Sequence, residues 1–276
     1  QTKQMQTALK DMQTKMLQSD KLDWEQQQSL QQLAEKQEKL QKQLEDNKKR
    51  FEEQIQQSKQ KNYSEDVREK QEELQKQMDN LLNKELKEQM KKLQELMAKL
   101  NKDNALQTMK QMEQENKLFN MDLERMKELM KKLELQMRME DLANKMDKLS
   151  KDQLALKKQT DEKTKDNKEL SKEQQDLKKQ LDEAMKEDMK EMKDLNSQMQ
   201  QKQDMGDAEN KADDARKDMQ QSEQQLGQQQ NNKASQSQKQ AAQNLQEMAN
   251  SLRSAAGGME MQQLDMDIRA VRQILT

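Results

Sequence analysis

The middle of the chain carries a regular alternation of apolar and polar positions. Between Phe119 and Met137, apolar side chains follow one another at intervals of four, three, four, three and four residues. This spacing places them along one stripe of an α-helix, and the charged positions between them, such as Asp122 and Lys132, are expected to face water. A narrow apolar stripe has to be buried against another helix, so we predict a helix-packing seam formed by Phe119, Leu123, Met126, Met130, Leu133 and Met137.

The same rhythm continues on both sides of this seam. Leucines and methionines recur at helical spacing in residues 30–44 and 74–100, and again in residues 170–199. After the seam the stripe resumes in a shifted frame from Leu135 to Leu156, as expected where a helix exchanges partners. We therefore predict an all-α fold of long antiparallel coiled-coil helical hairpins, extended rather than globular.

Three interruptions of the apolar rhythm predict turns near residues 62, 103 and 164. At Asn62–Ser64, the serine precedes two acidic residues, which is typical of a helix N-cap. Residues 101–104 contain two asparagines and an aspartate, which tolerate turn conformations. Residues 160–168 contain nothing apolar, so they form either the tip of a hairpin, which we favour, or a solvated stretch of continuing helix.

The character of the sequence changes after residue 205. Met205–Gly206–Asp207 is expected to be a helix C-cap, with the glycine in the left-handed conformation. Residues 206–240 predict a thinner helix followed from Gly227 by a Gln/Asn/Ser-rich linker. Residues 241–276 predict C-terminal helices broken at Gly257–Gly258.

The most hydrophobic stretch is at the end of the chain. Its apolar residues again share one helical stripe, and apolar surface of this kind is costly to leave in water. We expect the stripe to dock on the preceding helices, on sequence beyond Thr276 or on a different subunit. A partner contact is therefore predicted at Leu264, Ile268, Val271 and Leu275.

Composition separates a coiled coil from an ordinary globule. Only 30% of the 276 residues are hydrophobic, 1% are aromatic, and proline is absent. Such a chain is either disordered or a long helical assembly, and the sustained periodicity favours the assembly. The 51 basic and 53 acidic residues are intermixed, which argues against a nucleic-acid partner. No apolar run approaches the roughly 20 residues that cross a bilayer, so we expect no direct membrane insertion by this fragment.

Candidate catalytic and metal-binding residues are scarce. Histidine and cysteine are both absent, which removes the commonest general base, nucleophile and metal ligands. A calcium loop needs oxygen ligands at alternate positions around a central glycine, whereas here basic residues are interleaved with the acids. An exposed helical face is therefore the favoured interpretation of the acidic cluster of Asp207, Glu209, Asp213, Asp214 and Asp218. We predict a protein that is not an enzyme and has no metal site and no cofactor.

Methionine and glutamine leave two questions open. The 24 methionines share the apolar stripes with leucine, which favours core packing. The alternative is a plastic surface that accepts varied apolar clients, because methionine is flexible and polarizable. Glutamine at the core positions Gln37, Gln153 and Gln174 either fixes helix register or reflects drift in a low-complexity sequence.

A family resemblance lies in residues 241–275. The stretch AAQNLQEMA leads to Gly257–Gly258 and is followed by MEMQQL and DIRAVRQIL. It resembles the late region of very large Gln/Met-rich coiled-coil proteins of Bacteroidetes-type bacteria. These look anchored to a membrane at their N-terminus, and their function is largely undefined; elsewhere the chain is similar to them in composition only.

The resemblance implies a helical arm in the periplasm or cell envelope, with the cytoplasm as the alternative. The chain begins with Gln1 and ends inside an apolar stretch, so we expect a fragment whose inner-membrane anchor lies outside it. Its expected function is a non-enzymatic scaffold or spacer arm in a larger assembly with unidentified protein partners. The alternative is a Met-lined, client-binding arm of a periplasmic chaperone or protein-export complex, with membrane protein-export machinery as the partner.

Overall fold

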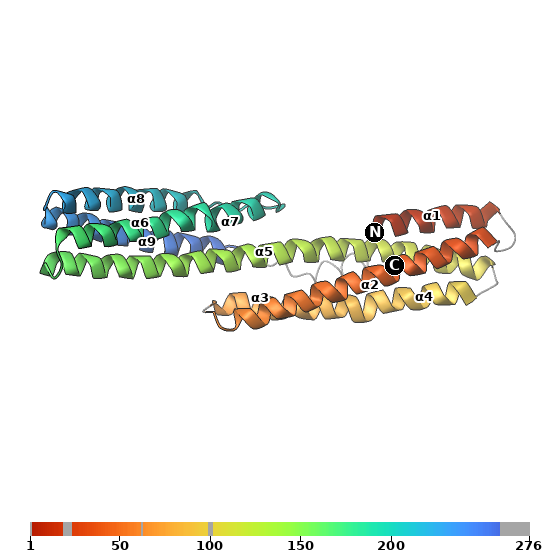
Figure 1. The fold of residues 1–276 in the computed structure, drawn as a ribbon. Helices are drawn as coiled ribbons and strands as arrows, with labels where there is room; N and C mark the ends of the chain where they lie inside the picture. Colours follow the sequence, from red (N-terminus) through yellow and green to blue (C-terminus); the bar gives the residue numbers. More distant parts are fainter. Residues whose placement is uncertain (1, 19–23, 62, 99–101, 260–276) are drawn as a thin grey trace. The chain divides into compact units, whose positions relative to one another are not determined.

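The computed structural model describes all residues except 1, 19–23, 62, 99–101 and 260–276, and its described part is all-α (Figure 1). No strand occurs in that part, which confirms the predicted all-α class. The helices are α1 (Thr2–Gln18), α2 (Trp24–Ser58), α3 (Glu65–Asn80), η1 (Leu81–Leu86), α4 (Lys87–Ala98), α5 (Lys102–Glu162), α6 (Asn167–Lys186), α7 (Asp188–Ser197), α8 (Gly206–Gly227) and α9 (Asn231–Gly257).

The chain divides into two compact units. Unit 1 comprises Gln1–Asn62 and Arg68–Met130, and unit 2 comprises Tyr63–Val67 and Lys131–Thr276. The 61-residue helix α5 contributes its first part to unit 1 and its remainder to unit 2. This division falls inside the predicted seam, between Met130 and Leu133.

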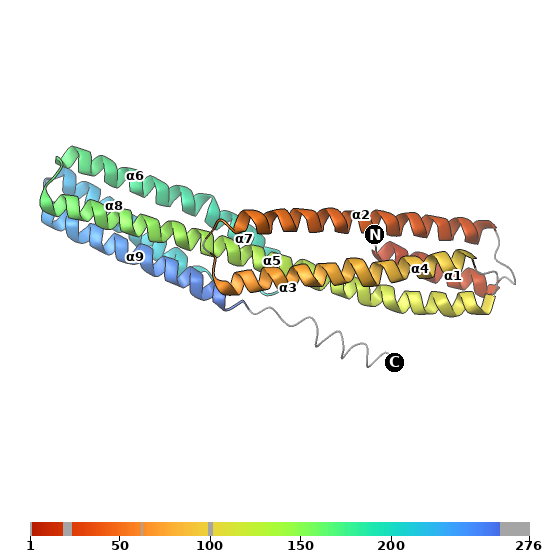
Figure 2. The same ribbon diagram turned by 90° about the horizontal axis from the view of Figure 1, so that it is seen from below.

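In unit 1, α2 runs antiparallel to the segment formed by α3, η1 and α4 (Figures 1 and 2). Three side-chain pairs fix this direction, because residue numbers rise along α2 as they fall along its partner: Gln37 with Gln89, Lys48 with Asp79, and Glu52 with Gln75. The chain therefore reverses between α2 and α3, at the place where the sequence predicts a turn near residue 62.

A π-helical turn, η1, absorbs an irregularity in the stripe of this segment. Leu74 and Met78 are buried at the expected spacing, but then Leu81 and Leu82 are both buried although they are adjacent. After Leu82 the three/four rhythm resumes. A π-turn accommodates one extra residue, so the two leucines can both face the interior while the helix continues.

The turn predicted at Asn101–Asn104 falls partly outside the described residues. Residues 99–101 lie outside the described part, and α5 already includes Lys102, Asp103 and Asn104. On either side of this turn, α4 and α5 lie side by side (Figures 1 and 2), and Lys92 of α4 forms an ion pair with Glu115 of α5.

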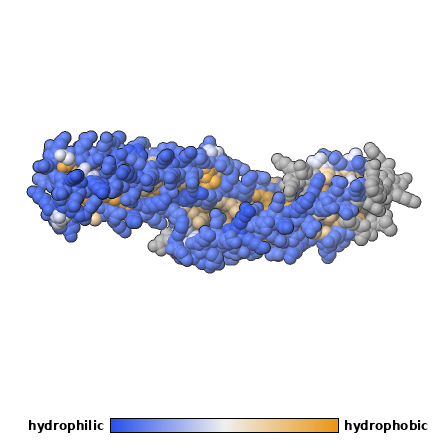
Figure 3. Space-filling view, viewed as in Figure 1, coloured by the Kyte–Doolittle hydropathy of each residue, from blue (hydrophilic) through white to orange (hydrophobic). Residues whose placement is uncertain are grey.

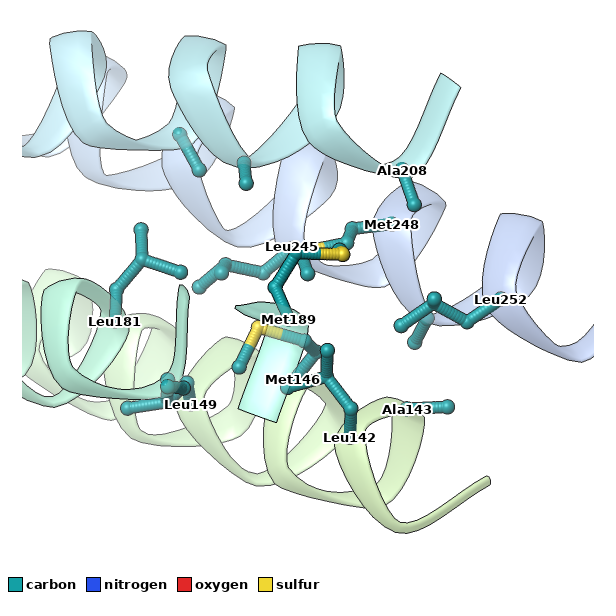
Figure 4. Packing of buried hydrophobic residues seen from close by; sticks show 14 of the residues in the cluster. Leu142, Ala143, Met146, Leu149, Leu181, Met189, Ala208, Leu245, Met248 and Leu252 are labelled. Atoms are coloured by element: carbon teal, nitrogen blue, oxygen red, sulfur yellow. The ribbon is translucent and has the colours of Figure 1, made fainter. Parts of the chain in front are cut away.

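In unit 2, four helical segments surround one apolar core. Side-chain hydrogen bonds join them in a ring: α5 with α6 through Gln153 and Gln174, α6 with α8 through Asp182 and Arg216, and α8 with α9 through Asp218 and Asn244. The ring closes where Ser150 of α5 donates to the carbonyl of Ala242 in α9. Each helix is antiparallel to its neighbours, which gives an up-down-up-down bundle. Figure 4 shows Leu142 and Met146 of α5 meeting Leu245 and Met248 of α9 in its core.

A loop at residues 163–166 joins α5 to α6, where the sequence favours a hairpin tip. Lys163 takes a left-handed conformation with φ of 53°, which lets the chain reverse without a glycine. Asp166 caps α6, because its Oδ1 accepts a hydrogen bond of 2.8 Å from the backbone N–H of Glu169.

The predicted C-cap at Met205–Gly206–Asp207 is wrong. Helix α7 ends at Ser197, and Gly206 is the first residue of α8, without a positive φ. The N–H of Gly206 donates to Asp204 Oδ1 at 2.9 Å, so an acidic residue supports the start of α8. The preceding loop is tied to α7 by Asn196, which exchanges two hydrogen bonds of 2.8 Å with the backbone of Gln203.

The predicted Gln/Asn/Ser-rich linker is also different in the structure. Only residues 228–230 separate α8 from α9, and residues 231–240 belong to α9. They are helical because small and polar side chains there are buried at helical spacing, including Ala234, Gln238 and Ala241. The inner stripe of α8 is similarly small, with Ala208, Ala212 and Ala215. Small side chains let the two backbones approach closely.

Candidate functional site: the helix-packing seam and buried polar pairs

The predicted seam on α5 is shielded from solvent along its described length. Phe119, Met126 and Leu133 are buried, with exposed fractions of 5% or less. Leu123, Met130 and Met137 are half-buried. None of the six side chains is exposed, so this stripe is packing surface in the structure.

The centre of the stripe is displaced from the predicted line. Asp122, Leu129 and Gln136 are more deeply buried than the predicted positions one residue later. Lys132 is buried as well, so the expectation that Asp122 and Lys132 face water is wrong. At Lys132 the reason is that buried residues occupy several faces of α5 in this region, including Leu133, Leu135 and Gln136.

In unit 2, the segment Tyr63–Val67 contacts α5 and covers part of its surface. The Tyr63 hydroxyl donates to Asp141 Oδ2 at 3.0 Å, and Gln136 Nε2 donates to Asp66 Oδ2 at 2.6 Å. Glu140 accepts hydrogen bonds from both the N–H and the hydroxyl of Ser64. The predicted N-cap is also present, since Ser64 Oγ accepts from the N–H of Val67 at 3.3 Å. A short polar segment thus binds one face of α5.

The core glutamines named from the sequence are paired across helices. Gln153 and Gln174 exchange two hydrogen bonds, of 2.7 and 2.9 Å, and both side chains have 0% exposure. Gln37 Nε2 donates to Gln89 Oε1 at 3.1 Å. A third buried pair, Ser58 with Gln71, joins α2 to α3.

These pairs favour the register interpretation over random drift. A buried amide without a partner costs about 1–3 kcal/mol, so sliding one helix by a turn would strand both members of a pair. Gln153 and Gln174 belong to the helices on either side of the 163–166 loop. Each pair therefore favours one axial alignment of the two antiparallel helices that it joins.

The methionines that the structure describes are packed almost entirely inside the bundles. Among those with described side chains, only Met121 is exposed, at 39%. Met139, Met146, Met192, Met219 and Met248 each have 0% exposure. On the face shown in Figure 3 the surface is mostly hydrophilic, with hydrophobic side chains visible in smaller patches.

In the acidic cluster of α8, Asp207, Asp213 and Asp214 are exposed, whereas Glu209 and Asp218 are half-buried. Glu209 pairs with Lys193 of α7, Asp213 with Arg216, and Asp214 with Lys217. Within the described residues, no group of three or more His, Cys, Asp or Glu side chains is arranged to hold a metal ion. Two of these acids thus pair with basic residues interleaved on α8, as the sequence indicates, and Glu209 pairs with a lysine of α7.

Three carboxyl groups of unit 2 have shifted pKa values. Burial raises the pKa of Asp218, which accepts a hydrogen bond of 2.8 Å from Asn244, and nearby Asp214 adds to the rise. Hydrogen bonds from Lys157 and Ser235 lower the pKa of Asp161. At Asp182, burial acts in the opposite direction, but hydrogen bonds from Arg216 and Lys178 keep the pKa below its ordinary value. These carboxyl groups therefore join neighbouring helices through hydrogen bonds.

The predicted partner contact of Leu264, Ile268, Val271 and Leu275 lies outside the described residues. Among the described helices, none combines the length and the apolar character needed to span a membrane. No protein-family model matches the chain, and no curated protein or solved structure matches it. The resemblance of residues 241–275 to Gln/Met-rich coiled-coil proteins thus stays a prediction from the sequence.

Proposed function

We propose that this chain is a non-enzymatic coiled-coil scaffold or spacer arm in a larger protein assembly of the cell envelope. The observation that carries this proposal is the burial of the methionines. Among the methionine side chains that the structure describes, only that of Met121 is exposed. A client-binding surface needs apolar side chains open to a partner, whereas these side chains already pack against their own helices. The envelope location rests on the resemblance of residues 241–275.

The arrangement of polar groups supports a static role. Ion pairs between helices, such as Arg216 with Asp182 at 2.6 Å and Arg253 with Asp147 at 2.5 Å, add specificity to the packing. Exposed pairs contribute only about 0–1 kcal/mol each, so they select the arrangement more than they stabilise it. Buried amide pairs then restrict the helices to one register.

An aggregation assay separates the scaffold from a client-binding arm. The purified chain is mixed at equal molar amounts with a reporter enzyme that unfolds on mild heating, and light scattering is followed. A scaffold leaves the scattering of the reporter unchanged. Suppression by the native chain, reduced in Met121→Lys but retained in the matched surface variant Gln175→Lys, would support the client-binding alternative instead.

The partner contact is tested separately in the full-length protein. We expect Ile268→Asp with Val271→Asp to lose the partner that co-purifies with the unaltered protein, because both positions lie on the apolar stripe. The matched control, Gln262→Asp with Gln273→Asp, introduces the same charge off the stripe and should keep the partner. If both double variants retain every partner and remain helical, the stripe is ordinary internal packing.

A further inference from the structure

A second polar pair faces the core of unit 2 close to Gln153 and Gln174. Ser222 of α8 and Gln238 of α9 both have 0% exposure. On this helix pair, Asp218 meets Asn244 and Gln225 meets Ser237. In that register Ser222 lies opposite Gln240, within two residues of Gln238.

The helix registers place this pair at the level of the bonded glutamines. Asp182 meets Arg216, so Gln174, eight residues before Asp182, lies opposite Gln224, two residues from Ser222. Ser150 meets Ala242, so Gln238, four residues before Ala242, lies opposite Leu154, which is adjacent to Gln153. Since a helix rises about 1.5 Å per residue, the four polar side chains share one level to within about 3 Å.

Only half of this polar layer is satisfied by the protein. Gln153 and Gln174 bond each other, whereas Ser222 Oγ and both Nε2 and Oε1 of Gln238 have no hydrogen-bond partner among the described residues. A buried amide and hydroxyl left without partners cost roughly 1–3 kcal/mol each, and native interiors rarely tolerate this. The two side chains therefore require a ligand that both donates and accepts hydrogen bonds.

Water fits the chemistry of this layer. Gln238 offers a donor and an acceptor, Ser222 offers a hydroxyl that does both, and all four polar side chains of the layer are neutral. An inorganic anion would use the donors alone and leave the Gln238 carbonyl oxygen unpaired. Ser222 is also far shorter than Met219 and Leu226, its neighbours on the same stripe, so a ligand that bonds to it and to Gln238 is expected to be small.

We propose that Ser222 and Gln238 bind a buried water molecule that bridges α8 to α9. The bridge completes a polar layer across all four helices of unit 2, with the direct Gln153–Gln174 pair on one side and a water-mediated pair on the other. Buried waters of this kind typically make two to four hydrogen bonds and belong to the folded structure. The layer thereby fixes the register of α8 and α9 as the glutamine pair fixes that of α5 and α6.

The test is the detection of water next to the Gln238 side-chain amide by NMR, using the complete 15N-labelled chain. We expect a cross-peak between water and the Nε2 protons with the sign of a long-lived bound water, absent in Gln238→Leu and weakened in Ser222→Ala. The matched control Gln236→Leu, at an exposed position of α9, should keep it. Circular dichroism confirms that each variant is folded.

Two results would overturn the proposal. The Gln238 amide could show no bound-water cross-peak in the folded chain, which would mean that it bonds directly to protein. Alternatively, its chemical shift could follow the replacement of chloride by bromide in the buffer, which would identify an anion in place of water.

Discussion

At the scale of single residues, buried amides matter more in this chain than their small number suggests. Leu149 and Leu156 lie on the same stripe of α5 as Gln153, so an apolar side chain could also occupy position 153. A glutamine there exchanges hydrophobic stabilisation for a directional contact that tolerates only one partner position. The buried glutamines thus specify helix register at the expense of hydrophobic stabilisation.

The Gln153–Gln174 pair gives a double-mutant prediction. Gln153→Leu should lower the free energy of unfolding by about 1–3 kcal/mol, because it leaves the Gln174 amide buried without a partner. The double variant Gln153→Leu with Gln174→Leu should be as stable as the unaltered chain or more stable, since no polar group is then buried without a partner. Urea unfolding followed by circular dichroism measures both. The exposed control Gln175→Leu should change stability by no more than about 0.5 kcal/mol. Additive losses in the double variant would contradict a coupled pair.

Asp218 gives a prediction about pH. Its pKa in the folded chain is raised above the ordinary 3.8, mainly by burial, so the folded state holds this proton more tightly than the unfolded state. The contribution of Asp218 to stability therefore decreases as pH rises from 3.8 through the folded pKa. Asp218→Asn should raise the melting temperature at neutral pH by a few degrees or less, because it removes the charge and keeps an oxygen acceptor for Asn244.

Below pH 3.8 this difference from the unaltered chain should disappear, since Asp218 is then protonated in both states. Asp176→Asn, at an exposed position of α6, is the control that makes the same substitution at the surface. An equal gain from Asp218→Asn at all pH values would show that burial of the charge is not its cause.

At the scale of the helix, the three/four spacing identified the α5 seam but not its exact centre line. Phe119, Met126 and Leu133 were placed correctly because they are apolar and evenly spaced. Burial of Asp122 and Gln136 could not be predicted, since polar side chains at core positions look like surface positions until their partners are known. Gln37, Gln153 and Gln174 could be named in advance, whereas the partner Gln89 and the pair of Ser222 and Gln238 could not.

Two other differences between the predicted and the observed fold also arise from the composition of the segments concerned. Residues 231–240 lack leucine and methionine, so their helix is visible only in the spacing of Ala234, Gln238 and Ala241. Glycine at position 206 suggests a helix end, but Asp204 two residues earlier supports a helix start. In both segments the apolar pattern is too weak to decide, and tertiary packing determines the outcome.

The seam itself can be tested by truncation. Phe119→Ala should lower the free energy of unfolding by about 3–5 kcal/mol, because the ring is 1% exposed and its removal leaves a cavity. Met121→Ala on the same helix should cost less than about 1 kcal/mol, since its side chain is 39% exposed. Equal losses in urea unfolding would show that the two positions do not differ in burial.

At the scale of the whole molecule, the account depends on what the methionines do. Each unit has a packed interior of its own. Apart from Met121, the described methionine side chains are buried or half-buried there, together with leucines. Within each unit, this packing leaves mainly hydrophilic side chains at the surface and defines the arrangement of the helices. The scaffold proposal fails if those side chains are in fact open to solvent or to clients.

Methionine oxidation measures this directly. The native chain is treated with tert-butyl hydroperoxide, and sulfoxide formation at each methionine is followed by peptide mass spectrometry, with the urea-unfolded chain as reference. We predict that Met121 reacts nearly as fast in the native as in the unfolded chain, while Met139, Met146, Met192, Met219 and Met248 are strongly protected. Similar rates at all of these positions in the native chain, slowed by an added unfolded client, would contradict the scaffold account and favour a client-binding surface.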